Sequence, residues 1–207
     1  MKLFSSTLFG PVQYFAHLAN EKEALIEIYC HYGRKSYRNR YSILGANDII
    51  SLSVPIEKQN KRCFTKDAII SYDTDWQNQH WKSIESAYNS SPYFLFYKDE
   101  LYDIIFKKWN NLLHLNIAAT EWIMECIDIE TKLNYTEEYY FAKENDFDTR
   151  ELILPKNRVA TDIHFKPIPY RQLFNINNKF VKNLSILDLL FNKGPESLLV
   201  LRDSYKP

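Results

Sequence analysis

The stretch Leu3-Phe4-Ser5-Ser6-Thr7-Leu8-Phe9-Gly10-Pro11-Val12-Gln13-Tyr14-Phe15, with the apolar run at 24–30 that follows it, decides the fold. Residues 3–9 predict a buried strand, Pro11 suits the first turn of a helix, and 24–30 predict a second strand. Because a β-α-β unit places its two strands parallel, with the helix as crossover, this start predicts an α/β protein.

The remainder of the chain extends this prediction. Two alternating apolar runs within 41–54 flank the turn Gly45-Ala46-Asn47-Asp48 and predict a hairpin. Helical patterns fill 74–128, and 142–158 is a polar, irregular loop. We predict one α/β domain over 1–207, with a mixed sheet, covering helices and a Rossmann-like or nucleotidyltransferase-like core. The alternative is an α+β fold in which 74–128 form a helical subdomain.

Composition excludes several classes of function. Lys+Arg and Asp+Glu both number 26, so the chain lacks the basic excess of a nucleic-acid binder. The three cysteines and five histidines are scattered, which predicts no metal site. Neither a glycine-rich phosphate loop nor a G-x-S-x-G or H-E-x-x-H motif occurs, and no cofactor is predicted. No apolar run approaches the ~20 residues of a membrane span, so we expect a cytoplasmic protein without membrane insertion. The oligomeric state stays open.

Against this neutral background, the segment Arg34-Lys35-Ser36-Tyr37-Arg38-Asn39-Arg40 concentrates four basic residues just before the hairpin. Guanidinium groups bond oxygens in pairs, so arginines beside a rigid hairpin can hold a phosphate or carboxylate. We predict that Arg38 and Arg40 share one side of an extended segment and hold an anion, with Asn39 on the other side. The alternative is a solvated loop with Tyr37 packed inward.

Several motifs, in the same order along nearly the whole chain, resemble the WbqC-like family. They are Gly10-Pro11-Val12-Gln13-Tyr14-Phe15, Lys35-Ser36-Tyr37-Arg38-Asn39-Arg40, Leu52-Ser53-Val54-Pro55, Trp76 with His80-Trp81-Lys82-Ser83-Ile84, Ala87-Tyr88 with Pro92-Tyr93-Phe94, and 183–192 with Gly194-Pro195-Glu196. Members of that family often belong to bacterial gene clusters for O-antigen and other surface polysaccharides. The resemblance therefore implies a cytoplasmic role in making such glycans.

Together, the basic segment and the resemblance predict a transferase-type enzyme that acts on a phosphate-bearing activated sugar. Its partner would be a small anionic molecule, either a nucleotide sugar or a sugar phosphate. Many family members carry a histidine after the first strand, where this chain has Ser5-Ser6-Thr7-Leu8-Phe9. The alternative is therefore a non-catalytic ligand-binding or scaffold protein of the same pathway.

The candidate site residues fall into two groups. Those for ligand binding are Gln13, Lys35, Tyr37, Arg38, Asn39, Arg40 and Asn192. Gln13 lies in the turn after the first strand, where α/β proteins commonly bind ligands. For catalysis, His80 has a pKa range suited to proton transfer, although its apolar helix face also fits a core residue. Asp188 lies inside an apolar helix. It either pairs with an arginine at the site or stabilises the free N–H groups at the helix start.

Overall fold

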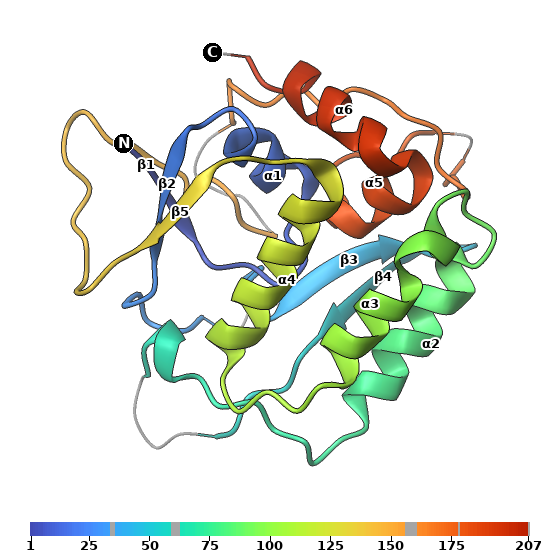
Figure 1. Ribbon diagram of the computed structural model, residues 1–207, viewed down its shortest axis with the longest axis horizontal. Helices are drawn as coiled ribbons and strands as arrows, with labels where there is room; N and C mark the ends of the chain where they lie inside the picture. Colours follow the sequence, from blue (N-terminus) through green and yellow to red (C-terminus); the bar gives the residue numbers. More distant parts are fainter. Residues whose placement is uncertain (34–35, 59–62, 156–160, 178, 207) are drawn as a thin grey trace.

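A computed structural model describes residues 1–33, 36–58, 63–155, 161–177 and 179–206 (Figure 1). In chain order its elements are β1 (Lys2–Ser5), α1 (Val12–Leu18), β2 (Glu23–Glu27), β3 (Arg40–Leu44), β4 (Ile49–Ser53), the 3-10 turn η1 (Thr65–Asp67), α2 (Trp76–Tyr88), α3 (Phe94–Phe106), α4 (Leu112–Ile127), β5 (Lys132–Tyr135), β6 (Phe147–Asp148), α5 (Ile186–Lys193), the 3-10 turn η2 (Gly194–Glu196) and α6 (Ser197–Asp203). No helix among the described residues is long and apolar enough to cross a membrane.

Four strands form a parallel sheet in the spatial order β5-β2-β1-β6. Counted along the chain, this is the order 3-2-1-4 that begins a Rossmann sheet. The α/β class, the β-α-β start and the hairpin are thereby confirmed. The hairpin strands β3 and β4 form a separate two-stranded antiparallel sheet instead of joining the parallel one.

Helices α1 and α4 cover the same face of the parallel sheet. The ring of Tyr14 on α1 lies 5.2 Å from the ring of Phe4, and the Asn116 amide on α4 donates to the Ser6 hydroxyl at 3.3 Å. Right-handed crossovers from β1 to β2 and from β2 to β5 put both helices on one side. Because strand side chains alternate, Leu3 and Ser5 point to the opposite face.

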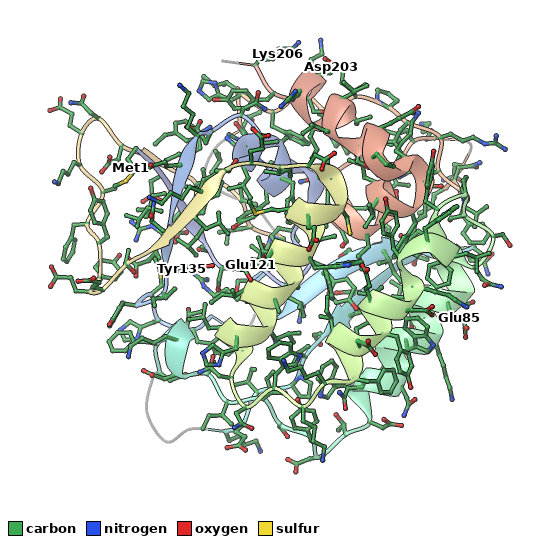
Figure 2. All side chains as sticks on the ribbon, viewed as in Figure 1. Met1, Glu85, Glu121, Tyr135, Asp203 and Lys206 are labelled. Carbon is green, nitrogen blue, oxygen red and sulfur yellow. The ribbon has the colours of Figure 1, made fainter. Side chains whose placement is uncertain are left out.

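One apolar core joins the two sheets. Helix α4 lies between the parallel strands and the part formed by the hairpin, α2 and α3 (Figure 1), and side chains fill the space on either side of it (Figure 2). Phe4 of β1, Tyr41 of β3 and Phe191 of α5 belong to the same buried cluster. Most of the aromatic side chains of the chain pack in or against this core.

The C-terminal helices are attached to the start of the chain through a short clamp. The N–H of Val12 donates to the carbonyl of Leu184, the N–H of Ile186 donates to the carbonyl of Gly10, and the Ser185 hydroxyl donates to the carbonyl of Phe9. Ser185 also accepts from the N–H of Leu187, as expected of a helix N-cap. The clamp holds together two segments that are about 170 residues apart in the sequence.

Three details of the predicted strands are wrong. The first strand ends at Ser5, not residue 9, because the chain turns there: Phe9 has φ 41° and the N–H of Leu8 donates to Tyr37. The short apolar run Ala68-Ile69-Ile70, which also predicts a strand, forms only isolated bridges. The polar region 142–158 contains β6, which is two residues long and too short for periodicity to indicate.

A glycine at the end of α5 gives a direct test of this packing. Gly194 has φ +55°, and a Cβ there would lie 2.5 Å from the ring of Tyr93. We expect Gly194→Ala to lower the free energy of unfolding by about 2–4 kcal/mol in urea denaturation, from backbone strain and overpacking. Gly33→Ala is the control, since a Cβ there meets nothing within 4 Å. Equal stability of the two variants would contradict this arrangement.

Candidate functional site

The carboxyl ends of the parallel strands form the candidate site. The sheet extends from β1 to β2 and β5 on one side, and the chain reaches β6 on the other side only afterwards. Open α/β sheets bind ligands where the strand order reverses in this way. Ser5 pairs with Glu27, and Leu3 pairs with Asp148. By alternation, the side chains of Ser5, Glu27 and Asp148 therefore emerge on the same face.

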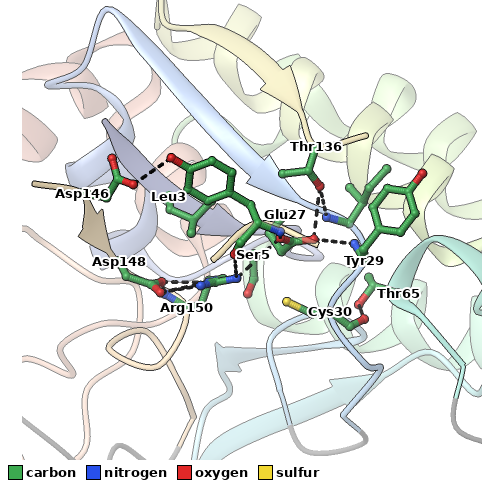
Figure 3. A network of polar contacts seen from close by, with 12 residues as sticks. Leu3, Ser5, Glu27, Tyr29, Cys30, Thr65, Thr136, Asp146, Asp148 and Arg150 are labelled. Carbon is green, nitrogen blue, oxygen red and sulfur yellow. Dashed lines mark hydrogen bonds and ion pairs between the residues drawn. The ribbon is translucent and has the colours of Figure 1, made fainter. Parts of the chain in front are cut away.

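Glu27, at the end of β2, is fully buried and collects donors from three segments (Figure 3). Its carboxylate accepts from the N–H of Tyr29 at 2.6 Å, the hydroxyl of Thr136 at 3.1 Å and the N–H of Tyr140 at 2.7 Å. Nη1 of Arg150 completes the set at 3.5 Å. These contacts fasten the segment after β5 onto the end of β2.

Arg150 follows β6 and is neutralised by carboxylates. Its Nε lies 2.9 Å and its Nη2 2.6 Å from the two oxygens of Asp148, and its Nη1 donates to the carbonyl of Tyr140 at 3.1 Å. The hydrogen bonds with Asp148 raise the pKa of Arg150 above its usual value. Because Glu27 and Asp148 both neutralise its charge, Arg150 is poorly suited to binding an anionic ligand.

Arg38 is different, because it is buried without a carboxylate. Its side chain is only 8% exposed, and Nη2 donates to the Ser5 hydroxyl at 2.9 Å. Among the described residues its Nε has no hydrogen-bond partner, and no carboxylate lies within ion-pair distance. A buried charge without a counter-charge is costly, so this guanidinium is suited to an anion from solution.

The described remainder of the basic segment leads from this strand end into the hairpin. Residues 36–39 form a turn, so the predicted extended geometry is wrong there. Tyr37 is half-buried and accepts from the N–H of Leu8, while the Asn39 amide donates to the carbonyl of Val54 at 2.8 Å. Asn39 Oδ1 and Arg40 Nε are buried and, within the described part of the chain, unpartnered. Lys35 lies outside the described residues.

Gln13 forms hydrogen bonds with other residues inside the fold. Its N–H donates to Asn183 Oδ1, its Oε1 accepts from the same amide, and its Nε2 donates to Asp162 at 2.7 Å. Asp162 also contacts Nε2 of the buried His17 at 2.7 Å, where desolvation lowers the histidine pKa. Gln13 thus ties α1 to the C-terminal segments, and both polar atoms of its side chain have partners inside the fold.

His80 lies inside the core. It is 2% exposed, its Nδ1 is 3.0 Å from the Tyr41 hydroxyl, and its ring makes edge contacts with Trp76 and Tyr41. Burial lowers the pKa of His80 to about 4, so the ring is neutral at pH 7. The geometry favours the core role for this residue over proton transfer.

Asp188 is the centre of a second buried polar cluster. Its carboxylate accepts from the hydroxyls of Tyr88 at 2.9 Å and Tyr170 at 2.7 Å, and from the Gln172 amide at 2.9 Å. Burial raises the pKa of Asp188. The Asn192 amide donates to the backbone carbonyl of Asp188. The structure therefore places Tyr37 and Arg38 beside the end of β1, Asn39 and Arg40 at the start of the hairpin, and Asp188 and Asn192 in α5.

Sequence reasoning missed Ser5, Glu27, Asp148 and Arg150. Glu27 had a detectable signal, because a carboxylate between Ile26 and Ile28 in an apolar run must find buried donors. Arg150 had none, since it lies in a polar stretch among other charges.

The strand order and the basic turn at the strand ends define an α/β protein with a candidate anion site at its carboxyl edge. The chain belongs to the WbqC-like protein family, whose sequence model matches residues 6–160 and 156–200. It is similar to the uncharacterized protein Rv1507c of Mycobacterium tuberculosis, with 26% identity in an alignment 214 positions long that covers 91% of each chain. No solved structure matches. Membership of the family suggests a role in polysaccharide biosynthesis.

Replacing Glu27 tests whether its carboxylate holds the site together. We expect Glu27→Gln to lower the free energy of unfolding by about 3–5 kcal/mol, because Arg150 and two backbone amides lose a buried acceptor charge. Glu23→Gln on the same strand is the matched control: its ion pair with Lys132 is long, at 3.9 Å, and exposed, so the loss should stay below about 1 kcal/mol. Urea denaturation of both variants measures the difference; similar losses would disprove the assignment.

The buried ring of His80 predicts a pH dependence of stability. Its folded pKa of about 4 lies below the ordinary 6.5, so the folded state resists protonation. The neutral ring contributes its full stabilisation above about pH 6.5. As the pH falls towards 4, the free energy of unfolding decreases by on the order of 3 kcal/mol. We expect His80→Gln to flatten the slope of unfolding free energy against pH in this window. His114→Gln, at an exposed position of α4, should keep the wild-type slope.

Proposed function

We propose that this protein is a transferase-type enzyme of surface polysaccharide biosynthesis, and that it binds a phosphate-bearing activated sugar at the carboxyl edge of the parallel sheet. The observation that carries the proposal is the buried guanidinium of Arg38, which has no carboxylate partner among the described residues. The phosphate of the ligand would supply the missing counter-charge. Membership of the WbqC-like family supports the choice of a glycan precursor.

Neighbouring groups supply further donors for a phosphate. The Ser5 hydroxyl oxygen accepts from Arg38, which leaves its own O–H free to donate. Arg40, two residues after Arg38, would add a second guanidinium, whose Nε has no partner among the described residues. A cation would find no free carboxylate here, because Glu27 and Asp148 are both engaged by Arg150.

The same arrangement would assist a glycosyl transfer. When the bond between the sugar carbon and the phosphate oxygen breaks, negative charge develops on the leaving phosphate. A guanidinium already fixed by Ser5, in a site shielded from water, stabilises that charge without having to reorganise. The role of Arg38 would then be electrostatic.

A second candidate is a non-catalytic binding or scaffold protein of the same pathway. It is favoured by the burial of His80 and Asp188, whose polar atoms are engaged inside the fold. Phosphorus NMR of the protein with a bound nucleotide sugar and a sugar acceptor separates the two. Release of free nucleotide indicates transfer, whereas unchanged phosphate resonances indicate binding alone.

Replacing Arg38 tests the anion site. In a calorimetric and thermal-shift panel of nucleotide sugars, nucleotides and sugar phosphates, we expect selective stabilisation of the wild type. Arg38→Met keeps the length of the side chain but loses charged hydrogen bonds, so affinity should fall about ten- to a hundred-fold. Arg202→Met, at an exposed position of α6, is the control and should bind like wild type.

Unchanged affinity of Arg38→Met would remove Arg38 from the site. If no ligand of the panel binds or stabilises the wild type, the result would instead favour a protein-interaction role and refute the proposed ligand.

A further inference from the structure

Two aromatic side chains lie exposed beside the candidate anion site. Phe141 is 79% exposed and Tyr139 is 43% exposed, and their ring centroids are 4.8 Å apart in an edge-to-face arrangement. The guanidinium carbon of Arg150 lies 5.5 Å from the centroid of the Tyr139 ring. These rings are large apolar groups left in water next to the charged residues at the strand ends.

The position of the pair is fixed by the residue between them. The N–H of Tyr140 donates to the buried carboxylate of Glu27, its carbonyl accepts from Arg150, and its hydroxyl donates to Asp146 at 2.9 Å. Tyr140 is thus bound at both backbone groups and at its side chain. Its two neighbours, Tyr139 and Phe141, contact each other and leave ring surface open to solvent.

The pair lies within reach of a ligand held by Arg38. Arg38 contacts Ser5, Ser5 pairs with Glu27 on the adjacent strand, and Glu27 contacts Arg150 beneath Tyr139. With neighbouring strands ~4.8 Å apart, the guanidinium groups of Arg38 and Arg150 are separated by on the order of 10 Å. One molecule with a phosphate at one end and a flat ring at the other can span that distance.

We propose that Tyr139 and Phe141 form the subsite for the nucleobase of a nucleotide-linked sugar whose phosphate is bound at Arg38; the inference rests on the proposed function and specifies its substrate class. A nucleobase has a π-face that stacks on aromatic rings and on guanidinium planes. Another exposed ring near the strand ends, Phe64, is already stacked on His31 at 5.2 Å and 14°. Phe141 has no such partner on its open side among the described residues.

The test compares two kinds of ligand and three variants by isothermal titration calorimetry. The ligands are a uridine-diphosphate sugar and the corresponding sugar 1-phosphate, which lacks the base. The double variant Tyr139→Ser, Phe141→Ser should weaken binding of the nucleotide sugar about ten-fold or more and leave the sugar phosphate unchanged. Arg38→Met should weaken both. Phe96→Ala is the control, because Phe96 is 76% exposed but lies on α3.

The outcomes separate this inference from the proposed function. If the double variant binds the nucleotide sugar like wild type while Arg38→Met loses both ligands, the aromatic subsite is wrong and the anion site survives. An equal loss of both ligands in the double variant also overturns the subsite, since the rings would then act on the phosphate end. If the wild type binds neither ligand, both proposals fail. Matching melting temperatures of wild type and variants show that the fold is intact.

Discussion

The buried carboxylate of Glu27 is the constraint on which the carboxyl edge of the sheet depends. Removing an ionised carboxylate from water costs several kcal/mol, and only a complete set of donors offsets that cost. Glu27 obtains its donors from 29, 136, 140 and 150, which come from three separate segments. Since each segment has to reach the end of β2, the same carboxylate positions the chain after β5 and the guanidinium after β6. Arg150 is thereby used for structure, whereas Arg38 has no carboxylate partner among the described residues.

The motifs that carry the family resemblance divide into those that serve the fold and one that reaches the candidate site. Gly10 to Gln13 and Asn183 to Ser185 meet in the clamp between the two ends of the chain, through backbone hydrogen bonds and the reciprocal Gln13–Asn183 pair. His80 joins the core beside Tyr41, and Asp188 gathers two tyrosines and a glutamine. Among these motifs, and within the described residues, the basic turn before β3 is the one that holds buried guanidinium nitrogens without a hydrogen-bond partner.

Sequence patterns were sufficient for the class of fold and for most elements, because the apolar periods of β1, β2, the hairpin and α2 are long enough to be recognised. The site was predicted only in part. The basic turn was visible as a local cluster, but its counterpart was not: Glu27 and Arg150 are 123 positions apart, and no local pattern indicates such a pair. The catalytic hypotheses for His80 and Asp188 followed from residue chemistry, which does not reveal burial. Asp188 was expected to act at the start of its helix, and instead its oxygens face three donors from other segments.

At the proposed anion site, Arg38 would also link ligand binding to stability. Its guanidinium is held under the sheet edge by one serine, so the unliganded protein carries a buried charge whose desolvation is only partly compensated. Any anion that binds there lowers the free energy of the folded state alone, and the gain grows with the logarithm of its concentration. Arg150, by contrast, is paired by both Glu27 and Asp148. The contrast between Arg38, without a carboxylate partner among the described residues, and the paired Arg150 is therefore the observation on which the proposed anion site rests.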